Sequence, residues 1–318
     1  MKVSILVPIY SVERYIQRCA ISLFEQTYND IEYIFVDDCT PDDSISILNN
    51  VINQYPFRRP QIRVIKHSLN KGLSAVRNTC IKNATGDFLL FVDSDDYLEK
   101  DAVEKLVKAQ LNSDSDIVTG QALVHKHNCE YIMSRPQFYN HTDFVADMLQ
   151  LTNNHTVWGR LIRKSLFDDY NIHTLEGINI GEDMQLMSQL SYHSKEFVTI
   201  NDIVYHYDNT NMISYMNSYS FNDRNKYINR LLQDIESVKF VYNFFYKEDQ
   251  RYIPLIKDNL RLLYRRLRVE YFILNDKENY YFITYKLREL NENLHVSFMS
   301  KIKENFYVSK ILTKIRKY

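Results

Sequence analysis

The feature of this 318-residue sequence that most restricts its fold is a regular alternation of short apolar runs and helix-like segments near its start. Four runs rich in Val, Ile, Leu and Phe have the composition of strands buried on both faces: residues 3–8, 31–36, 62–66 and 87–92. Three segments with helical apolar spacing separate them: residues 12–26, 43–55 and 72–83. The pattern predicts an α/β fold with a mostly parallel sheet flanked by helices.

The remainder of the sequence is less regular. Residues 115–215 mix strand-like pieces with helical segments, whereas Tyr227 to Tyr318 is rich in Tyr, Leu, Lys and Arg at helical spacing. We therefore expect an α/β domain over residues 1–216, divided near residue 125, and a helical C-terminal region over residues 217–318.

The composition excludes several classes of protein. With 39 Lys and Arg against 40 Asp and Glu, the net charge of -1 predicts no nucleic-acid partner. No run of about 18 apolar residues indicates a membrane span, so we expect a cytoplasmic protein. The four cysteines, 19, 39, 80 and 129, lack the spacing of a zinc site or a disulfide framework.

Carboxylates follow two of the predicted strands, where a parallel sheet places its ligand site. Asp93, Asp95 and Asp96 come after the fourth strand, and hard oxygen ligands so close together suit Mg²⁺ or Mn²⁺. Asp37 and Asp38 come after the second strand and are candidates for hydrogen bonds to a base or ribose. The alternative for both groups is that they form turns and cap the helices that follow.

Five blocks of this sequence follow one another in order: SILVPIYSVERYIQRCAISLFEQTY, VDDCTPDDS, KGLSAVRN, ATGDFLLFVDSDDYL and IGEDMQL. Together they resemble the family 2 glycosyltransferases of GT-A fold. The resemblance implies inverting transfer of a hexosyl or N-acetylhexosaminyl group from a nucleoside-diphosphate sugar, usually UDP-linked, with Mn²⁺ or Mg²⁺. It also implies a saccharide or glycolipid acceptor. Residues 1–125 then form the nucleotide-binding half and residues 126–216 the acceptor half.

The same resemblance assigns the donor site. In the family, the first loop approaches the nucleotide, and one aspartate contacts the uracil with a neighbour in support. The DxD motif holds the ribose and the metal-bound diphosphate. The matching residues here are Pro8, Tyr10, Glu13, Asp37 in support, Asp38 at the uracil, Arg77 in the pocket wall, and Asp93, Ser94 and Asp95 in the DxD motif, with Asp95 on the metal. From its sequence context alone, Arg77 also fits a solvated surface pair with Lys71.

The acceptor site is assigned in the same way. Asp183 matches the aspartate that resembles a general base, with Glu182 beside it, although both also suit the first turn of a helix. Trp158 is a candidate to stack on an acceptor sugar, or a core residue. His206 is a second candidate metal ligand, or a structural histidine. Ser11, Cys39 and Cys80 depart from the Asn, Gly and Gly that are usual in the family.

The C-terminal region carries basic helical stretches at residues 260–268 and 301–318. They fit contact with an anionic membrane at the inner face of the cell, or packing on the catalytic domain. Two other functions compete with sugar transfer. A nucleotidyltransferase would need a glycine-rich phosphate loop after the first strand, which residues 8–11 lack. A catalytically silent scaffold that binds sugar nucleotides is the third reading.

Overall fold

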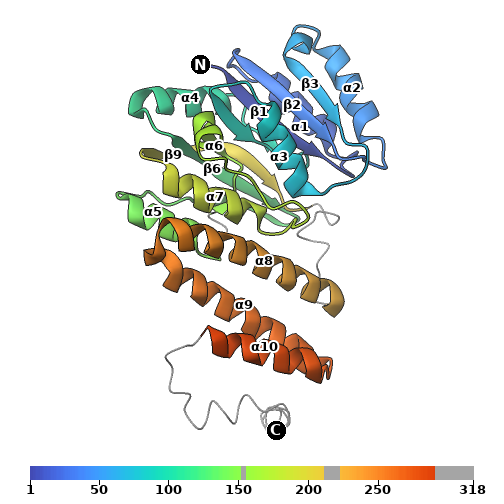
Figure 1. Cartoon of the computed structure of the whole chain (residues 1–318). Coiled ribbons are helices and arrows are strands. Elements are labelled where there is room, and N and C mark those ends of the chain that lie inside the picture. Colours follow the sequence, from blue (N-terminus) through green and yellow to red (C-terminus); the bar gives the residue numbers. More distant parts are fainter. Residues whose placement is uncertain (152–154, 211–222, 291–318) are drawn as a thin grey trace. The chain divides into compact units, whose positions relative to one another are not determined.

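The structure is a computed structural model, and it describes residues 1–151, 155–210 and 223–290 (Figure 1). The chain forms two compact units, Met1–Ser218 and Tyr219–Tyr318. The predicted boundary between residues 216 and 217 lies outside the described residues. The division of the first unit into nucleotide and acceptor halves stays a prediction.

The first unit is built on one sheet, which has nine strands within the described ranges. They are β1 (Val3–Ile9), β2 (Ile31–Asp37), β3 (Ile62–Lys66), β4 (Phe88–Phe91), β5 (Tyr97–Leu98), β6 (Ile117–Lys126), β7 (Cys129–Met133), β8 (Arg160–Arg163) and β9 (Phe197–Asp208). Their order is β3-β2-β1-β4-β8-β6-β9-β5, with β7 beside β6. The first four strands pair in parallel, and β8 then runs antiparallel to both β4 and β6. The α/β prediction is confirmed, and β6 and β9 form a second parallel pair in the other half of the sheet.

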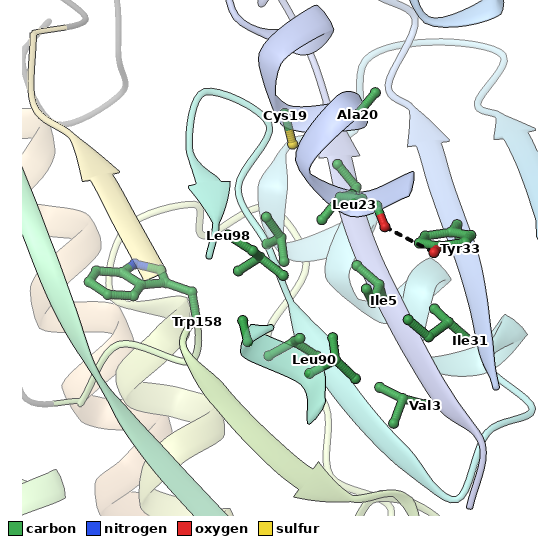
Figure 2. Packing of buried hydrophobic residues seen from close by; sticks show 14 of the residues in the cluster. Val3, Ile5, Cys19, Ala20, Leu23, Ile31, Tyr33, Leu90, Leu98 and Trp158 are labelled. Atoms are coloured by element: carbon green, nitrogen blue, oxygen red, sulfur yellow. Dashed lines mark hydrogen bonds between the residues drawn. The ribbon is translucent and has the colours of Figure 1, made fainter. Parts of the chain in front are cut away.

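Helices cover both faces of this sheet (Figure 1). On one face pack α1 (Ile16–Phe24), α2 (Ser44–Gln54) and α4 (Ala102–Ser113). On the other pack α3 (Leu73–Asn83), α5 (His141–Met148), α6 (Lys164–Asp169) and α7 (Glu182–His193). Side chains alternate along β1, so Ile5 joins the first core and Leu6 the second. Figure 2 shows the first core, where the Tyr33 hydroxyl donates to the Leu23 carbonyl over 2.9 Å.

One sequence prediction about the strands is wrong. Strand β3 is not buried on both faces, since most of its residues are partly or fully exposed and Val64 is 41% exposed. The reason is its position, because β3 is the outermost strand beside β2. An edge strand has a neighbour on one side only, which the apolar composition of residues 62–66 does not reveal.

The second unit is helical, as expected. Its described elements are α8 (Arg224–Glu248), the 3₁₀ turn η3 (Gln250–Tyr252), α9 (Ile253–Ile273) and α10 (Lys277–Glu289). The basic stretch at residues 260–268 lies in α9, where Leu260, Leu263 and Leu267 are buried. Residues 301–318 lie outside the described part of the chain. In the ranges that the structure describes, no helix combines the length and apolarity needed to cross a bilayer.

Candidate active site

Two loops meet at the carboxyl ends of β1 and β2, which pair up to Ile9 and Asp37. Asp42 joins them, since its carboxylate accepts the Glu13 amide over 2.9 Å and the Thr40 and Ser44 hydroxyls over 2.6 Å each. Burial alone would raise the pKa of Asp42, but these hydrogen bonds lower it. The first and second loops are therefore one bonded unit.

Two residues in these loops explain departures from the family pattern. Ser11 and Cys39 have φ angles of 54° and 58°, in the left-handed region. Gly adopts this region without steric cost, and Asn visits it more readily than most residues. The Gly usual at position 39 and the Asn usual at position 11 thus match the backbone conformation, which Ser11 and Cys39 retain.

The predicted first-loop residues occupy different environments. Tyr10 is 48% exposed at the loop, and Pro8 is half-buried in β1. Glu13 is exposed and accepts the Asp43 amide over 3.3 Å. The Thr40 amide donates to Asp37 over 2.8 Å within the second loop, and the Thr40 hydroxyl accepts the Ser11 amide of the first loop over 2.8 Å.

Asp38 organises the loop before α3. Its carboxylate accepts the Lys71 amide over 2.9 Å and the Gly72 amide over 2.8 Å, and it lies 2.7 Å from His67 Nδ1. The residue is buried. In this structure Asp38 therefore shapes the wall of the predicted nucleotide pocket, and its contact with a base stays a prediction.

Arg77 joins the predicted donor and acceptor motifs. Its Nη2 lies 3.4 Å from Asp93 Oδ1, 3.3 Å from Glu182 Oε1 and 3.1 Å from Asp183 Oδ1. The side chain is buried, so the solvated surface pair with Lys71 is excluded. Among the described residues, Arg77 Nε and Nη1 have no hydrogen-bond partner. Both nitrogens are also buried away from solvent.

Burial of these charges shifts their protonation. Burial alone would lower the pKa of Arg77, but the carboxylates of Asp183, Asp93 and Glu182 together raise it. Burial, with Asp183 nearby, raises the pKa of Glu182 to about 8 although Arg77 opposes the shift. Burial likewise raises the pKa of Asp93, against the effect of Arg77. One guanidinium thus balances three carboxyl groups, which favours a shared proton near Glu182.

The start of α7 is held against the start of α3. The side chain of Asn179 accepts the Ser74 amide over 3.2 Å, and Ser74 Oγ donates to the Ile178 carbonyl. A Cβ atom at Gly72, whose φ is +85°, would collide with Asn179. Gly72 is therefore required for this close approach, which carries Glu182 and Asp183 to Arg77.

Tyr205, which is not among the predicted site residues, anchors the DxD loop. The Tyr205 hydroxyl accepts the Asp93 amide over 3.1 Å and donates to Asp96 Oδ2 over 2.7 Å. The other oxygen of Asp96 accepts the Asp208 amide over 2.8 Å. The helix-capping alternative is wrong for these aspartates, because α4 begins only at Ala102. Ser94 is buried in this loop and Asp95 is half-buried.

We next compared the sequence with models of known protein families. The model of glycosyl transferase family 2 matches residues 4–170, more than half of the chain. The chain belongs to this family.

Individual relatives and solved structures are consistent with this family assignment. The uncharacterized glycosyltransferase EpsJ of Bacillus subtilis is 36% identical over 189 residues, covering 57% of the chain and 53% of EpsJ, so the chain spans about half of that relative. A structure of Staphylococcus aureus TarS residues 1–349 with UDP-GlcNAc has a TM-score of 0.61 at 19% identity, covering 91% of this chain and 92% of that one. A Pyrobaculum calidifontis mannosyltransferase with GDP-Man and Mn²⁺ has a TM-score of 0.54 at 12% identity, covering 100% and 88% of the two chains. These two structures support the fold.

Trp158 does not present an open ring. It is 4% exposed, its ring stacks on Tyr205 at 4.4 Å, and the Arg135 guanidinium lies 4.7 Å from the ring centroid. The prediction that it stacks on an acceptor finds no open face here, because core side chains cover the indole. Its contact with Tyr205 instead supports the DxD loop.

His206 does not offer a free nitrogen to a metal. Its Nε2 lies 2.8 Å from Glu99 Oε1 and its Nδ1 lies 2.9 Å from His125 Nε2. Its ring also stacks on Tyr97 at 4.3 Å. A histidine ligand needs one unshared ring nitrogen, so the structure contradicts this candidate.

Asp95, the remaining candidate metal ligand, fits a divalent ion whose coordination is completed by the phosphates of the donor. In the described part of the chain, no three His, Cys, Asp or Glu side chains are grouped to hold a metal. Mg²⁺ and similar ions at nucleotide sites are commonly held by one or two carboxylates together with substrate phosphates. The half-buried carboxylate of Asp95, a hard oxygen ligand at the end of a strand, suits that arrangement.

Proposed function

We propose that this glycosyltransferase moves a hexosyl or N-acetylhexosaminyl group from a UDP-sugar to a hydroxyl of a saccharide or lipid-linked saccharide, with inversion at the anomeric carbon. The observation that carries the proposal is Arg77, whose Nη2 lies within 3.4 Å of carboxylates from both the DxD loop and α7. Donor and acceptor motifs therefore share one site. The UDP-GlcNAc in the TarS structure supports the choice of nucleotide.

In this mechanism Asp183 is the general base. Its Oδ1 faces Arg77, which leaves Oδ2 to accept the proton of the acceptor hydroxyl. The acceptor oxygen then bonds to the anomeric carbon as the bond from that carbon to the phosphate oxygen breaks. The electron pair of the broken bond leaves with UDP. Attack from the face opposite the leaving group inverts the configuration.

The other residues hold the donor. The bonded loops at Glu13 and Asp38 enclose the nucleotide. Arg77 holds Asp93 of the DxD loop in place beside the donor. Asp95 would hold Mn²⁺ or Mg²⁺ against the diphosphate, and the ion would neutralise charge on the departing nucleotide. Glu182, beside Asp183, is proposed to contact the acceptor.

The test is calorimetric titration of UDP, GDP and CMP into the full chain, each with Mn²⁺ and with EDTA. The proposal expects UDP to bind and Mn²⁺ to strengthen its binding. Turnover of a UDP-sugar should then give a product whose anomeric configuration, measured by NMR, is opposite to that of the donor. Retained configuration would refute inversion. UDP binding without any turnover would instead favour the scaffold, and nucleotide transfer to a sugar phosphate would favour the nucleotidyltransferase.

A further inference from the structure

A cationic groove runs along the outer side of α1. It has a volume of about 460 Å³ and lies between α1 and the segment that follows the DxD loop. Its lining includes Arg14, Arg18 and Glu25 on the side of α1, and Leu98 and Lys100 opposite. The spacing of the α1 residues places them along one helix face. The volume lies within the range of small-ligand sites.

The positive charge of the groove is only partly compensated. Arg18 pairs with Asp208 at 2.6 Å and lies over the Tyr97 ring at 4.4 Å. Arg14 and Lys100 are exposed, and their side chains make no ion pair or hydrogen bond with the described residues. Glu25, at the far end, accepts the Tyr55 hydroxyl over 2.9 Å. Two cations thus remain available to an anion.

The stability of α1 does not explain these cations. Arg14 and Arg18 flank the start of the helix at Ile16, where the helix dipole already makes the potential positive. Cations are slightly unfavourable there, and the first turn carries no acidic residue to offset them. Their effect is to concentrate positive potential at one end of the groove.

That end of the groove adjoins the candidate active site. Arg18 Nη2 donates to the backbone carbonyl of Asp95 over 3.0 Å. Arg14 directly follows Glu13 of the first loop. Between Arg14 and Glu25 the groove follows α1, whose 9 residues span about 13 Å at 1.5 Å per residue. An extended ligand bound in the groove would therefore lie along α1, with one end beside the sugar-transfer site.

We propose that this groove binds phosphate groups of a phosphodiester-linked acceptor chain. The proposal rests on the function proposed above and specifies the acceptor. Arg14 and Lys100 hold phosphate oxygens by charge-assisted hydrogen bonds, while the hydroxyl to be glycosylated lies near Asp183. The lining has no aromatic ring on which a neutral sugar would stack. Its apolar members, Ile21 and Leu98, are not exposed, which argues against insertion into a lipid surface.

The test measures binding of a labelled short poly(glycerol phosphate) chain to the full protein. The double variant Arg14→Gln with Lys100→Gln is compared with Lys82→Gln with Lys108→Gln, which removes two exposed lysines outside the groove. Loss of two solvent-exposed charge contacts should weaken binding about tenfold. The control variant should bind within about twofold of the wild type, since it differs equally in net charge. UDP affinity, measured on the same samples, should be the same in all three proteins.

The outcomes separate this proposal from the proposed function. If both double variants bind the chain equally weakly, the attraction is non-specific, and the proposal that the groove is a binding site is wrong. No binding of the chain by the wild type would also overturn it. Binding to phosphatidylglycerol vesicles through Arg14 and Lys100, without binding of the free chain, would replace it with a lipid surface. If UDP fails to bind but poly(glycerol phosphate) binds through the groove, the donor assignment is wrong and the proposal about the groove is still supported.

Discussion

Arg77 Nη2 of α3 lies 3.1 Å from Asp183 Oδ1 of α7, so a donor-side residue holds the carboxylate proposed to deprotonate the acceptor. Replacement of Asp183 by Asn should keep the side-chain shape and remove the base. We expect kcat to fall at least about 100-fold, the range of general-base catalysis. UDP affinity, measured by calorimetry, should change little. Turnover equal to that of the wild type would remove Asp183 from the mechanism.

Replacement of Arg77 by Met should leave one buried and two partly buried carboxyl groups without a counter-charge. Removal of one partner from a buried ion-pair network typically costs about 3–5 kcal/mol. We expect a loss of that size in the free energy of unfolding, measured in urea. Arg14→Met, which removes an exposed arginine, should cost less than about 0.5 kcal/mol. Similar stability of the two variants would show that Arg77 is not a structural hub.

The raised pKa of Glu182 predicts a specific pH dependence of stability. Its pKa is about 8 in the folded protein, above its ordinary value of 4.5. Between these values the folded state binds a proton that the unfolded state has lost, so stability falls as the pH rises from 4.5 to 8. Glu182→Gln resembles the protonated form and should remove this part of the decrease.

Urea denaturation of wild type and Glu182→Gln at pH 5, 7 and 9 checks this. The variant should gain stability relative to the wild type as the pH rises. A constant difference across the three pH values would mean that Glu182 keeps its ordinary pKa.

Tyr205 is expected to act as a positioning residue for the DxD loop. Tyr205→Phe keeps the ring against Trp158 but removes the hydrogen bonds to Asp93 and Asp96. We expect Mn²⁺-dependent UDP binding to weaken about tenfold, equivalent to about 1.4 kcal/mol. Tyr28→Phe, which loses a 2.6 Å bond to the Met1 carbonyl, is the matched control. Wild-type UDP affinity in a folded Tyr205→Phe protein would contradict the role.

Asp95→Ala should remove the effect of metal on donor binding. UDP affinity in Mn²⁺ should fall to the value that the wild type shows in EDTA, because the carboxylate that carries the ion is gone. Asp202→Ala, which removes an exposed carboxylate, should retain the difference between Mn²⁺ and EDTA. If Asp95→Ala keeps the difference in UDP affinity between Mn²⁺ and EDTA, a residue other than Asp95 holds the metal.

The sequence predicted the N-terminal half of the fold well because its signals are local. The apolar runs at residues 3–8 and 31–36 became β1 and β2, and the segment 72–83 became α3. The second half depends on pairing between distant segments. Strand β8 has four residues and lies antiparallel between β4 and β6. No local periodicity specifies such a neighbour.

The candidate site divides in the same way. Asp93 and Asp183 were found from motifs, but their common contact with Arg77 depends on how α7 packs against α3. Burial of the arginine has no local signal, since a charged residue is most often exposed. His206 has a sequence signal because an imidazole suggests metal binding. Tyr205 has none, because a tyrosine hydroxyl that bonds to the Asp93 amide and the Asp96 carboxylate belongs to no motif.

The exposed position of Cys39 in the second loop has a practical consequence. Cys39 and Cys129 are exposed, whereas Cys19 and Cys80 are buried. A Cys129→Ser protein would therefore present one accessible thiol, located on the loop that Asp42 fastens to Glu13. A thiol-reactive fluorophore placed there would report, through its emission, the arrival of a nucleotide and its release in real time.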